Sequence, residues 1–149
     1  MSELTLKLDY EYLLNEEFIT YILSQNGVLE VKIDKENDEI YLKYDANIIS
    51  LERLYYEIKF FLDLLNIPSL LSFDKHSKNK TTKYIMKIED ICCEYCLKGM
   101  IAELLETKGI EKINTNYNEY DQWEDILFYI EYDETLISKD AILELEKKI

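Results

Sequence analysis

Short runs of alternating apolar and polar residues occur along the chain, separated by segments whose apolar residues recur at helical spacing. Residues 84–88 and 126–133 alternate in the way that predicts strands with one buried face. Residues 97–105 have the spacing of an amphipathic helix, and Gly109 follows as a residue that commonly ends one. Ser138 is a good N-cap for a last helix. The pattern therefore predicts the order β-α-β-β-α for this half of the chain.

The same pattern occurs earlier, shifted by 82 residues. The matched positions are Leu4 and Leu6 with Met86 and Ile88; Ile19, Ile22 and Leu23 with Ile101, Leu104 and Leu105; Gly27, Val28 and Val31 with Gly109, Ile110 and Ile113. After a six-residue difference in the hairpin, Tyr44-Asp45 matches Tyr132-Asp133, and Ser50 matches Ser138. We interpret this as an internal repeat; the alternative is two generic patterns without kinship. The first helix of each copy is expected near residues 16–25 and 96–108.

All three cysteines of the chain lie within five residues, as Cys92, Cys93 and Cys96, directly before the predicted helix. The spacing C-x-x-C at the start of a helix brings two thiolates to the positive end of the helix dipole. Two such thiolates form a soft, chelating site for a metal ion. Two other interpretations remain, buried structural cysteines and a redox pair. A thioredoxin-like redox fold needs a cis-proline after the cysteines, and the only proline, Pro68, precedes them.

Three motifs in this half resemble the heavy-metal-associated domain of copper chaperones and metal-transporting P-type ATPases. They are Asp90-Ile91-Cys92-Cys93-Glu94-Tyr95-Cys96, Gly109-Ile110-Glu111-Lys112-Ile113 and Tyr129-Ile130-Glu131-Tyr132-Asp133. The family has G-M-x-C-x-x-C at the first motif, so Asp90-Ile91 and the additional Cys92 depart from its pattern. The resemblance covers residues 83–149.

The resemblance implies an α+β fold of two tandem ferredoxin-like βαββα(β) units with antiparallel sheets. We expect a first unit at residues 1–72, a polar linker at residues 73–82 and a second unit at residues 83–149. Residues 67–73 could close the first sheet. The first unit has Glu11 and Leu14 in place of Cys93 and Cys96, so we expect it to bind no soft metal. Its second helix, from Ser50, is unusually apolar and is expected to pack on the second unit.

The function implied is binding of one soft metal ion by Cys93 and Cys96, with Cys92 or Asp90 as a further ligand. Cu(I) suits two thiolates, whereas a third thiolate or a carboxylate favours Zn(II) or Cd(II). The cysteine motif also resembles the I-C-C-x-x-E variant of plant zinc-transporting ATPases. The partner implied is a metal-transporting ATPase or another metal-carrying protein, for metal trafficking or sensing. The alternative is an interaction or dimerisation module that binds no metal.

The formal net charge of −14 narrows the range of partners. An acidic surface without a basic stripe disfavours nucleic acid. The sequence has neither a glycine-rich phosphate loop nor a set of nucleophile and base, so we expect no enzyme. His76 lies in the polar linker, where a solvated role is expected, with metal ligation as the alternative. The start lacks the features of a signal peptide and no apolar run suits a membrane span, so we expect a cytoplasmic protein.

Overall fold

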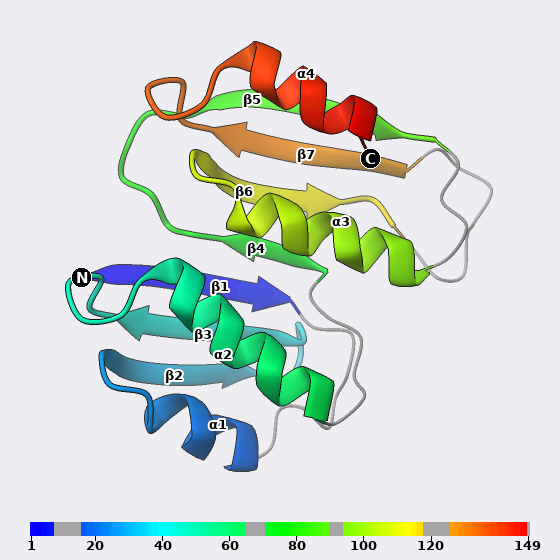
Figure 1. Ribbon diagram of the computed structural model, residues 1–149. Helices are drawn as coiled ribbons and strands as arrows, with labels where there is room; N and C mark the ends of the chain where they lie inside the picture. The colour runs from blue at the N-terminus through cyan, green and yellow to red at the C-terminus, as the bar shows by residue number, and fades with distance from the viewer. Residues whose placement is uncertain (8–15, 65–70, 90–93, 118–125, 149) are drawn as a thin grey trace.

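The structure is a computed structural model that describes residues 1–7, 16–64, 71–89, 94–117 and 126–148. These residues form four helices and one seven-stranded antiparallel sheet, an α+β architecture (Figure 1). The elements in chain order are β1 (Ser2–Lys7), α1 (Glu16–Leu23), β2 (Val28–Asp34), β3 (Glu39–Tyr44), α2 (Leu51–Leu64), β4 (Ser72–Asp74), β5 (Thr82–Ile88), α3 (Glu94–Glu106), β6 (Ile110–Thr115), β7 (Ile126–Tyr132) and α4 (Lys139–Lys148). No helix of the described residues is long and apolar enough to cross a membrane.

The strands of both halves belong to one continuous sheet, with the order β2-β3-β1-β4-β6-β7-β5. The expectation of a separate sheet for each unit is therefore corrected. The junction is β4, in which Phe73 pairs with Leu6 of β1 on one side and with Ile113 of β6 on the other. Phe73 is only 2% exposed, so burial of this ring and pairing of both strand edges stabilise the junction together.

The expected linker at residues 73–82 begins inside β4 and ends at the first residue of β5. The backbone N–H of Lys75 donates to the carbonyl of Glu111 at 2.9 Å, which continues the β4–β6 pairing by one residue. Residues 75–81 then connect the two halves outside the regular strands.

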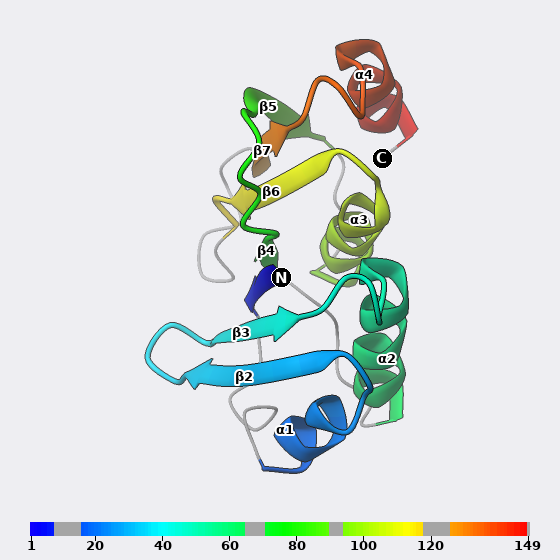
Figure 2. The ribbon, with the colours of Figure 1, turned by 90° about the vertical axis from the view of Figure 1, so that its left-hand side faces the viewer.

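All four helices lie on one face of the sheet, and the other face carries no helix of the described residues (Figure 2). Side chains that alternate toward the helices are buried, as Leu4, Leu42, Phe128 and Ile130 are. The intervening residues of the same strands are mostly polar. This arrangement is typical of an antiparallel sheet with one dry and one solvated face.

The two halves share the same turn after their first helix. Gly27 and Gly109 both adopt positive φ angles, 103° and 99°, which glycine tolerates without steric cost. The carbonyl of Gly27 accepts from the backbone N–H of Asp45 at 2.8 Å, and the carbonyl of Gly109 accepts from that of Asp133 at 2.7 Å. The matched glycines and aspartates of the sequence therefore perform the same structural task in each half.

The helices that follow these turns are capped in the same way. Ser50 Oγ accepts from the backbone N–H of Arg53 at 3.1 Å, and Ser138 Oγ accepts from that of Ala141 at 3.1 Å. Each serine satisfies a backbone donor that the first turn of a helix leaves unpaired. The predicted N-cap role of both serines is confirmed.

The 82-residue match is wrong in detail before Gly27 and Gly109. Leu42 and Ile130 occupy equivalent positions in the two hairpins. Leu42 pairs with Leu4, but Ile130 pairs with Tyr84, two residues before Met86, the predicted counterpart of Leu4. A slip of two residues preserves the face on which a strand side chain lies, so the apolar pattern cannot detect it. The helices also differ, because the predicted counterparts Ile19 and Ile101 do not occupy equivalent core positions: Ile19 is only partly buried and Ile101 is fully buried. In the same way, Leu23 is 44% exposed and its predicted counterpart Leu105 is 1% exposed.

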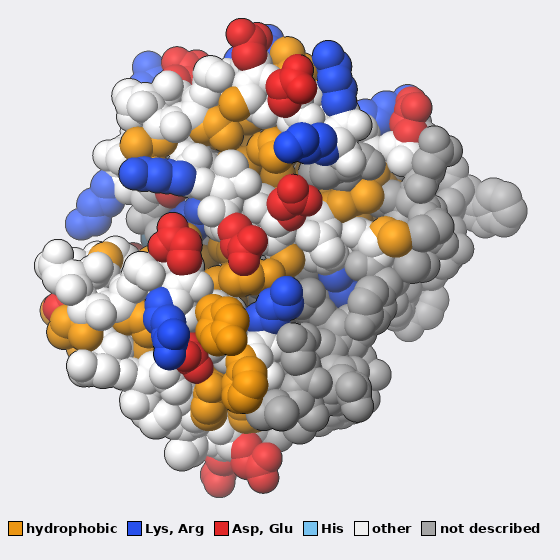
Figure 3. Space-filling model, in the orientation of Figure 1, with side chains coloured by type: hydrophobic (Ala, Val, Ile, Leu, Met, Phe, Trp, Pro, Cys, Tyr) orange, Lys and Arg blue, Asp and Glu red, His pale blue; other side chains and the backbone are white. Residues whose placement is uncertain are grey.

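Helix α2 packs between α1 and α3, so its expected contact with the second half is confirmed (Figures 1 and 2). Its buried side chains are Leu54, Tyr55, Ile58 and Phe61. Two aromatic residues of α2 remain exposed, Tyr56 at 59% and Phe60 at 47%, and Figure 3 shows hydrophobic side chains gathered over this helix. The apolar surplus of α2 is thus covered only in part by the described residues.

Candidate metal-binding loop and nearby polar sites

Cys96 is the third residue of α3 and has an exposed side chain. The prediction that it lies in the first turn of this helix is confirmed. The other predicted ligands, Cys92 and Cys93, and Asp90 lie outside the described residues. The structure thus gives the position of one thiol of the C-x-x-C motif and of the helix that follows it.

Helix α3 is fixed against the sheet by the side chains that follow Cys96. Leu97, Ile101 and Leu104 are fully buried. Because these residues occupy the sheet-facing side of the helix, Cys96 lies on the side that faces solvent. The predicted helix at residues 96–108 begins two residues earlier, at Glu94, so Cys96 lies within the helix instead of at its first position.

A buried lysine follows closely in the same helix. Lys98 is 1% exposed, an unusual position for a lysine. Lys98 lies on the buried side of α3 and Cys96 on the solvent side, so the N-terminal end of the helix is the source of positive potential near Cys96. Positive potential of this kind favours the thiolate, which is the form of cysteine that binds metals and acts as a nucleophile.

The described residues hold no group of three or more histidine, cysteine, aspartate or glutamate side chains placed to bind a metal ion. A set of three such donors that includes Cys96 therefore requires at least one ligand from outside the described residues or from another molecule. Two cysteine sulfurs three residues apart would give a soft, two-coordinate site. A third sulfur or a carboxylate would allow the higher coordination that zinc prefers.

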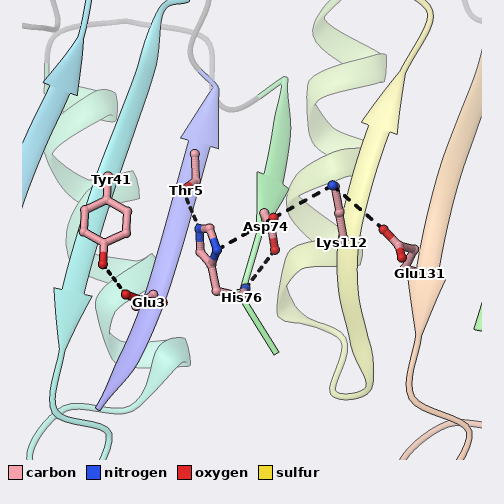
Figure 4. Close-up of polar contacts among 7 residues, drawn as sticks. All are labelled: Glu3, Thr5, Tyr41, Asp74, His76, Lys112 and Glu131. Carbon is pink, nitrogen blue, oxygen red and sulfur yellow. Dashed lines mark hydrogen bonds and ion pairs between the residues drawn. The ribbon is translucent and has the colours of Figure 1, made fainter. Parts of the chain in front are cut away.

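His76, the only histidine of the chain, lies away from Cys96. It lines a cleft together with Glu106 at the last turn of α3, whereas Cys96 lies ten residues earlier, about 15 Å along the helix axis. The Nε2 atom of His76 is 2.7 Å from Thr5 Oγ1, and its backbone N–H donates to Asp74 at 2.8 Å (Figure 4). His76 thus belongs to a polar network on the open face of the sheet. The sequence predicted a solvated histidine in a linker, and the structure places the ring within hydrogen-bond distance of Thr5.

This network crosses the junction between the halves. Asp74 and Glu131 each form an ion pair with Lys112 at 3.9 Å, which joins β4, β6 and β7 (Figure 4). Next to it, the Tyr41 hydroxyl donates to Glu3, which raises the pKa of Tyr41 to about 12 and lowers the pKa of Glu3. These side chains are only partly buried, so each contact contributes little to the stability of the fold.

A cleft of about 390 Å³ lies between the two halves, at the end of the sheet where α3 finishes. Lys75 and Glu111 both line it, and burial lowers the pKa of Lys75 and raises the pKa of Glu111. The Lys75 ammonium donates to the carbonyl of Thr107 at 3.4 Å. The sequence did not predict this cleft. The cleft forms because β4 pairs with β6, and no local sequence pattern predicts that pairing.

Comparisons with known proteins do not identify the chain. A scan against protein-family models finds no match, and a search of the curated proteins finds no relative. The resemblance to the heavy-metal-associated domain therefore rests on the three motifs of the sequence.

Proposed function

We propose that this chain binds one soft metal ion, Cu(I) or Zn(II)/Cd(II), through Cys93 and Cys96, with Cys92 or Asp90 as a further ligand. The observation that carries the proposal is the exposed Cys96 in the first turn of α3. A thiol at this place is accessible to a metal ion and to a partner that delivers or removes it. Metal trafficking or sensing in the cytoplasm, without catalysis, is the role that fits such a site.

Exposure of Cys96 argues against a purely structural role for this cysteine. Unreactive cysteines are typically enclosed among apolar side chains. The cysteine lies on the solvent side of α3, whereas the enclosed positions of this helix are Leu97, Lys98, Ile101, Ala102, Leu104 and Leu105. An exposed cysteine that follows two others closely in sequence is better explained by a ligand.

We also infer that the two halves are tandem ferredoxin-like units, of which the first has lost its ligands. Three features support this inference. Within each half the strands lie in the order second, third, first, as β2-β3-β1 and as β6-β7-β5. Both halves have a bulge where the second strand starts to pair with the third, and both repeat the bond from aspartate to glycine at that end.

The partner that suits an exposed thiolate site is another metal-carrying protein, such as a metal-transporting ATPase. Transfer between two such sites needs a shared intermediate in which ligands of both proteins hold the ion, and an exposed loop allows that approach. The second candidate function, an interaction module without metal, is favoured by the exposed Tyr56 and Phe60 of α2.

The experiment is a competition titration of the reduced protein with Cu(I) and with Zn(II), against chelators of known affinity. We expect one equivalent of metal for the parent and no detectable binding for the double variant Cys93→Ser/Cys96→Ser. The single variant Cys92→Ser is the matched control. It should retain Cu(I) binding, and it should weaken Zn(II) binding if Cys92 is a ligand.

Circular dichroism should show the parental fold in both variants, because the described core contains none of the cysteines. Equal binding by the parent and by the double variant would reject the proposal. Loss of metal binding in Cys92→Ser alone would show that Cys93 and Cys96 are not the ligand pair.

A further inference from the structure

The second half leaves open a strand edge that the first half covers. In the first half, β4 pairs with the outer edge of β1. The strand of the second half that is equivalent to β1 is β5. It lies at the end of the sheet and, among the described residues, pairs with β7 alone (Figure 1). An unpaired edge offers a row of backbone donors and acceptors to another strand.

The side chains of β5 on the face without helices are basic and apolar. Lys83, Ile85 and Lys87 alternate with the buried Met86 and Ile88, and all three are exposed. Ile85, which is 58% exposed, pairs with Tyr129 of β7, which is 42% exposed. The result is a small apolar centre between two lysines, on a chain whose net charge is −14. Lys83 lies opposite Glu131 of β7, whose carboxylate forms an ion pair with Lys112 at 3.9 Å.

We propose that the edge of β5 binds an extended acidic segment of a partner protein, which adds to the sheet as an eighth strand. The backbone of β5 would supply hydrogen bonds to the segment, as in other cases of strand addition. Lys83 and Lys87 would pair with its acidic residues, and the exposed Ile85 and Tyr129 would receive an apolar residue between them.

A second copy of the chain suits this edge less well than an acidic partner. A two-fold axis normal to the sheet would place β5 beside β5 of the copy, antiparallel, with Ile85 opposite Ile85. Lys83 of each copy would then lie opposite Lys87 of the other, and like charges in this position are destabilising. Pairing of β5 with β2 of a copy would be heterologous and would produce an open filament instead of a closed dimer.

The inference is independent of metal binding, because none of its residues belongs to the cysteine motif. It can therefore fail while the metal proposal stands, and the reverse also holds. Lys87 already contacts Glu89 at 3.8 Å, and since both side chains are exposed, this pair is weak enough to be replaced by a partner's carboxylate.

The test uses the full chain and a fluorescein-labelled peptide with the repeat Glu-Thr-Val-Thr, in which glutamate and valine alternate along one face of an added strand. Binding is followed by fluorescence anisotropy at low salt. The same peptide with lysine in place of glutamate tests charge, and the acidic peptide with alternate residues N-methylated tests backbone pairing. We expect binding of the acidic peptide alone, and we expect N-methylation to abolish it. Hydrogen exchange on the parent should show protection of the β5 amides when the acidic peptide binds.

The double variant Lys83→Glu/Lys87→Glu should weaken binding of the acidic peptide at least tenfold and should gain affinity for the lysine peptide. The matched control is Lys32→Glu/Lys43→Glu, which changes the same number of charges on the same face near the opposite edge and should bind as the parent does.

Three results would overturn the inference. The first is equal binding of the acidic and lysine peptides by the parent, and the second is unchanged affinity after N-methylation. The third is self-association of the parent that Ile85→Lys abolishes, since it would make a second copy the occupant. The hydrogen-exchange measurement needs no variant, so the inference stays testable even if a charge reversal unfolds the chain.

Discussion

Replacement of the two turn glycines by alanine should destabilise the protein by similar amounts, because the turns are built alike. A Cβ atom added at Gly27 would lie 2.7 Å from Ile49 Cγ2, and one added at Gly109 would lie 2.6 Å from Ile137 Cγ2. Both distances are well inside ordinary van der Waals contact. Both glycines also have positive φ angles, which alanine adopts at a cost of about 1–2 kcal/mol.

The free energy of unfolding should fall by about 2–4 kcal/mol in each variant. This magnitude combines the conformational cost with about 1–2 kcal/mol for the steric overlap, at the low end of what overpacking costs. Gly109→Ala should be the more severe change, since the new Cβ would also meet the backbone nitrogen of Ile137 at 3.1 Å, which cannot rotate away. For a domain of this size the melting temperature should fall by about 5–15 °C.

The assay is urea unfolding monitored by circular dichroism, with Gly99→Ala as the internal control. Gly99 lies in the middle of α3, and a Cβ added there would meet nothing within 4 Å. Gly99→Ala should therefore stabilise the protein by about 0.5–1 kcal/mol. If Gly27→Ala and Gly109→Ala change stability by less than about 0.5 kcal/mol, the claim that these turns require glycine is refuted.

Two further predictions concern the junction and the helix face. Phe73→Ala should lower the free energy of unfolding by about 3–5 kcal/mol, because the ring is buried between β1 and β6. Phe60→Ala, on the exposed face of α2, should change the free energy of unfolding by less than about 0.5 kcal/mol. Urea unfolding measures both effects, and equal effects would contradict the role of Phe73 at the junction. A hydrogen bond from the Tyr84 hydroxyl to Glu146 raises the pKa of Tyr84 to about 12, so its contribution to stability is complete below pH 10 and is lost as the pH rises toward 12. Tyr84→Phe should make the alkaline loss of stability shallower in this range, and an unchanged pH profile would show that the bond contributes nothing.

Local pattern was enough to predict the elements that local chemistry determines. Gly109 ends α3, Ser50 and Ser138 cap α2 and α4, and Cys96 lies in a first helical turn, all of which depend on a few neighbouring residues. Helix boundaries were less accurate: the helix expected at residues 16–25 ends at Leu23, and the other begins two residues early.

The single sheet could not be predicted in the same way. Its junction is a three-residue strand with one buried side chain, Phe73, in a stretch whose polar residues resemble a linker. Which two edges such a strand joins depends on tertiary packing and not on its own pattern. The sequence also did not show that the structural counterpart of Leu4 is Tyr84 and not Met86. A shift of two residues leaves the apolar face of a strand unchanged, so the apolar pattern fits both alignments. The roles of Cys92 and Cys93 remain predictions.

The most direct test of the central claim is X-ray absorption spectroscopy of the reduced protein loaded with one equivalent of Cu(I) or of Zn(II). The account predicts sulfur ligands, two or three around the metal, with Zn–S distances of about 2.3 Å in the zinc form. A metal shell of nitrogen and oxygen alone, with no sulfur, would contradict it.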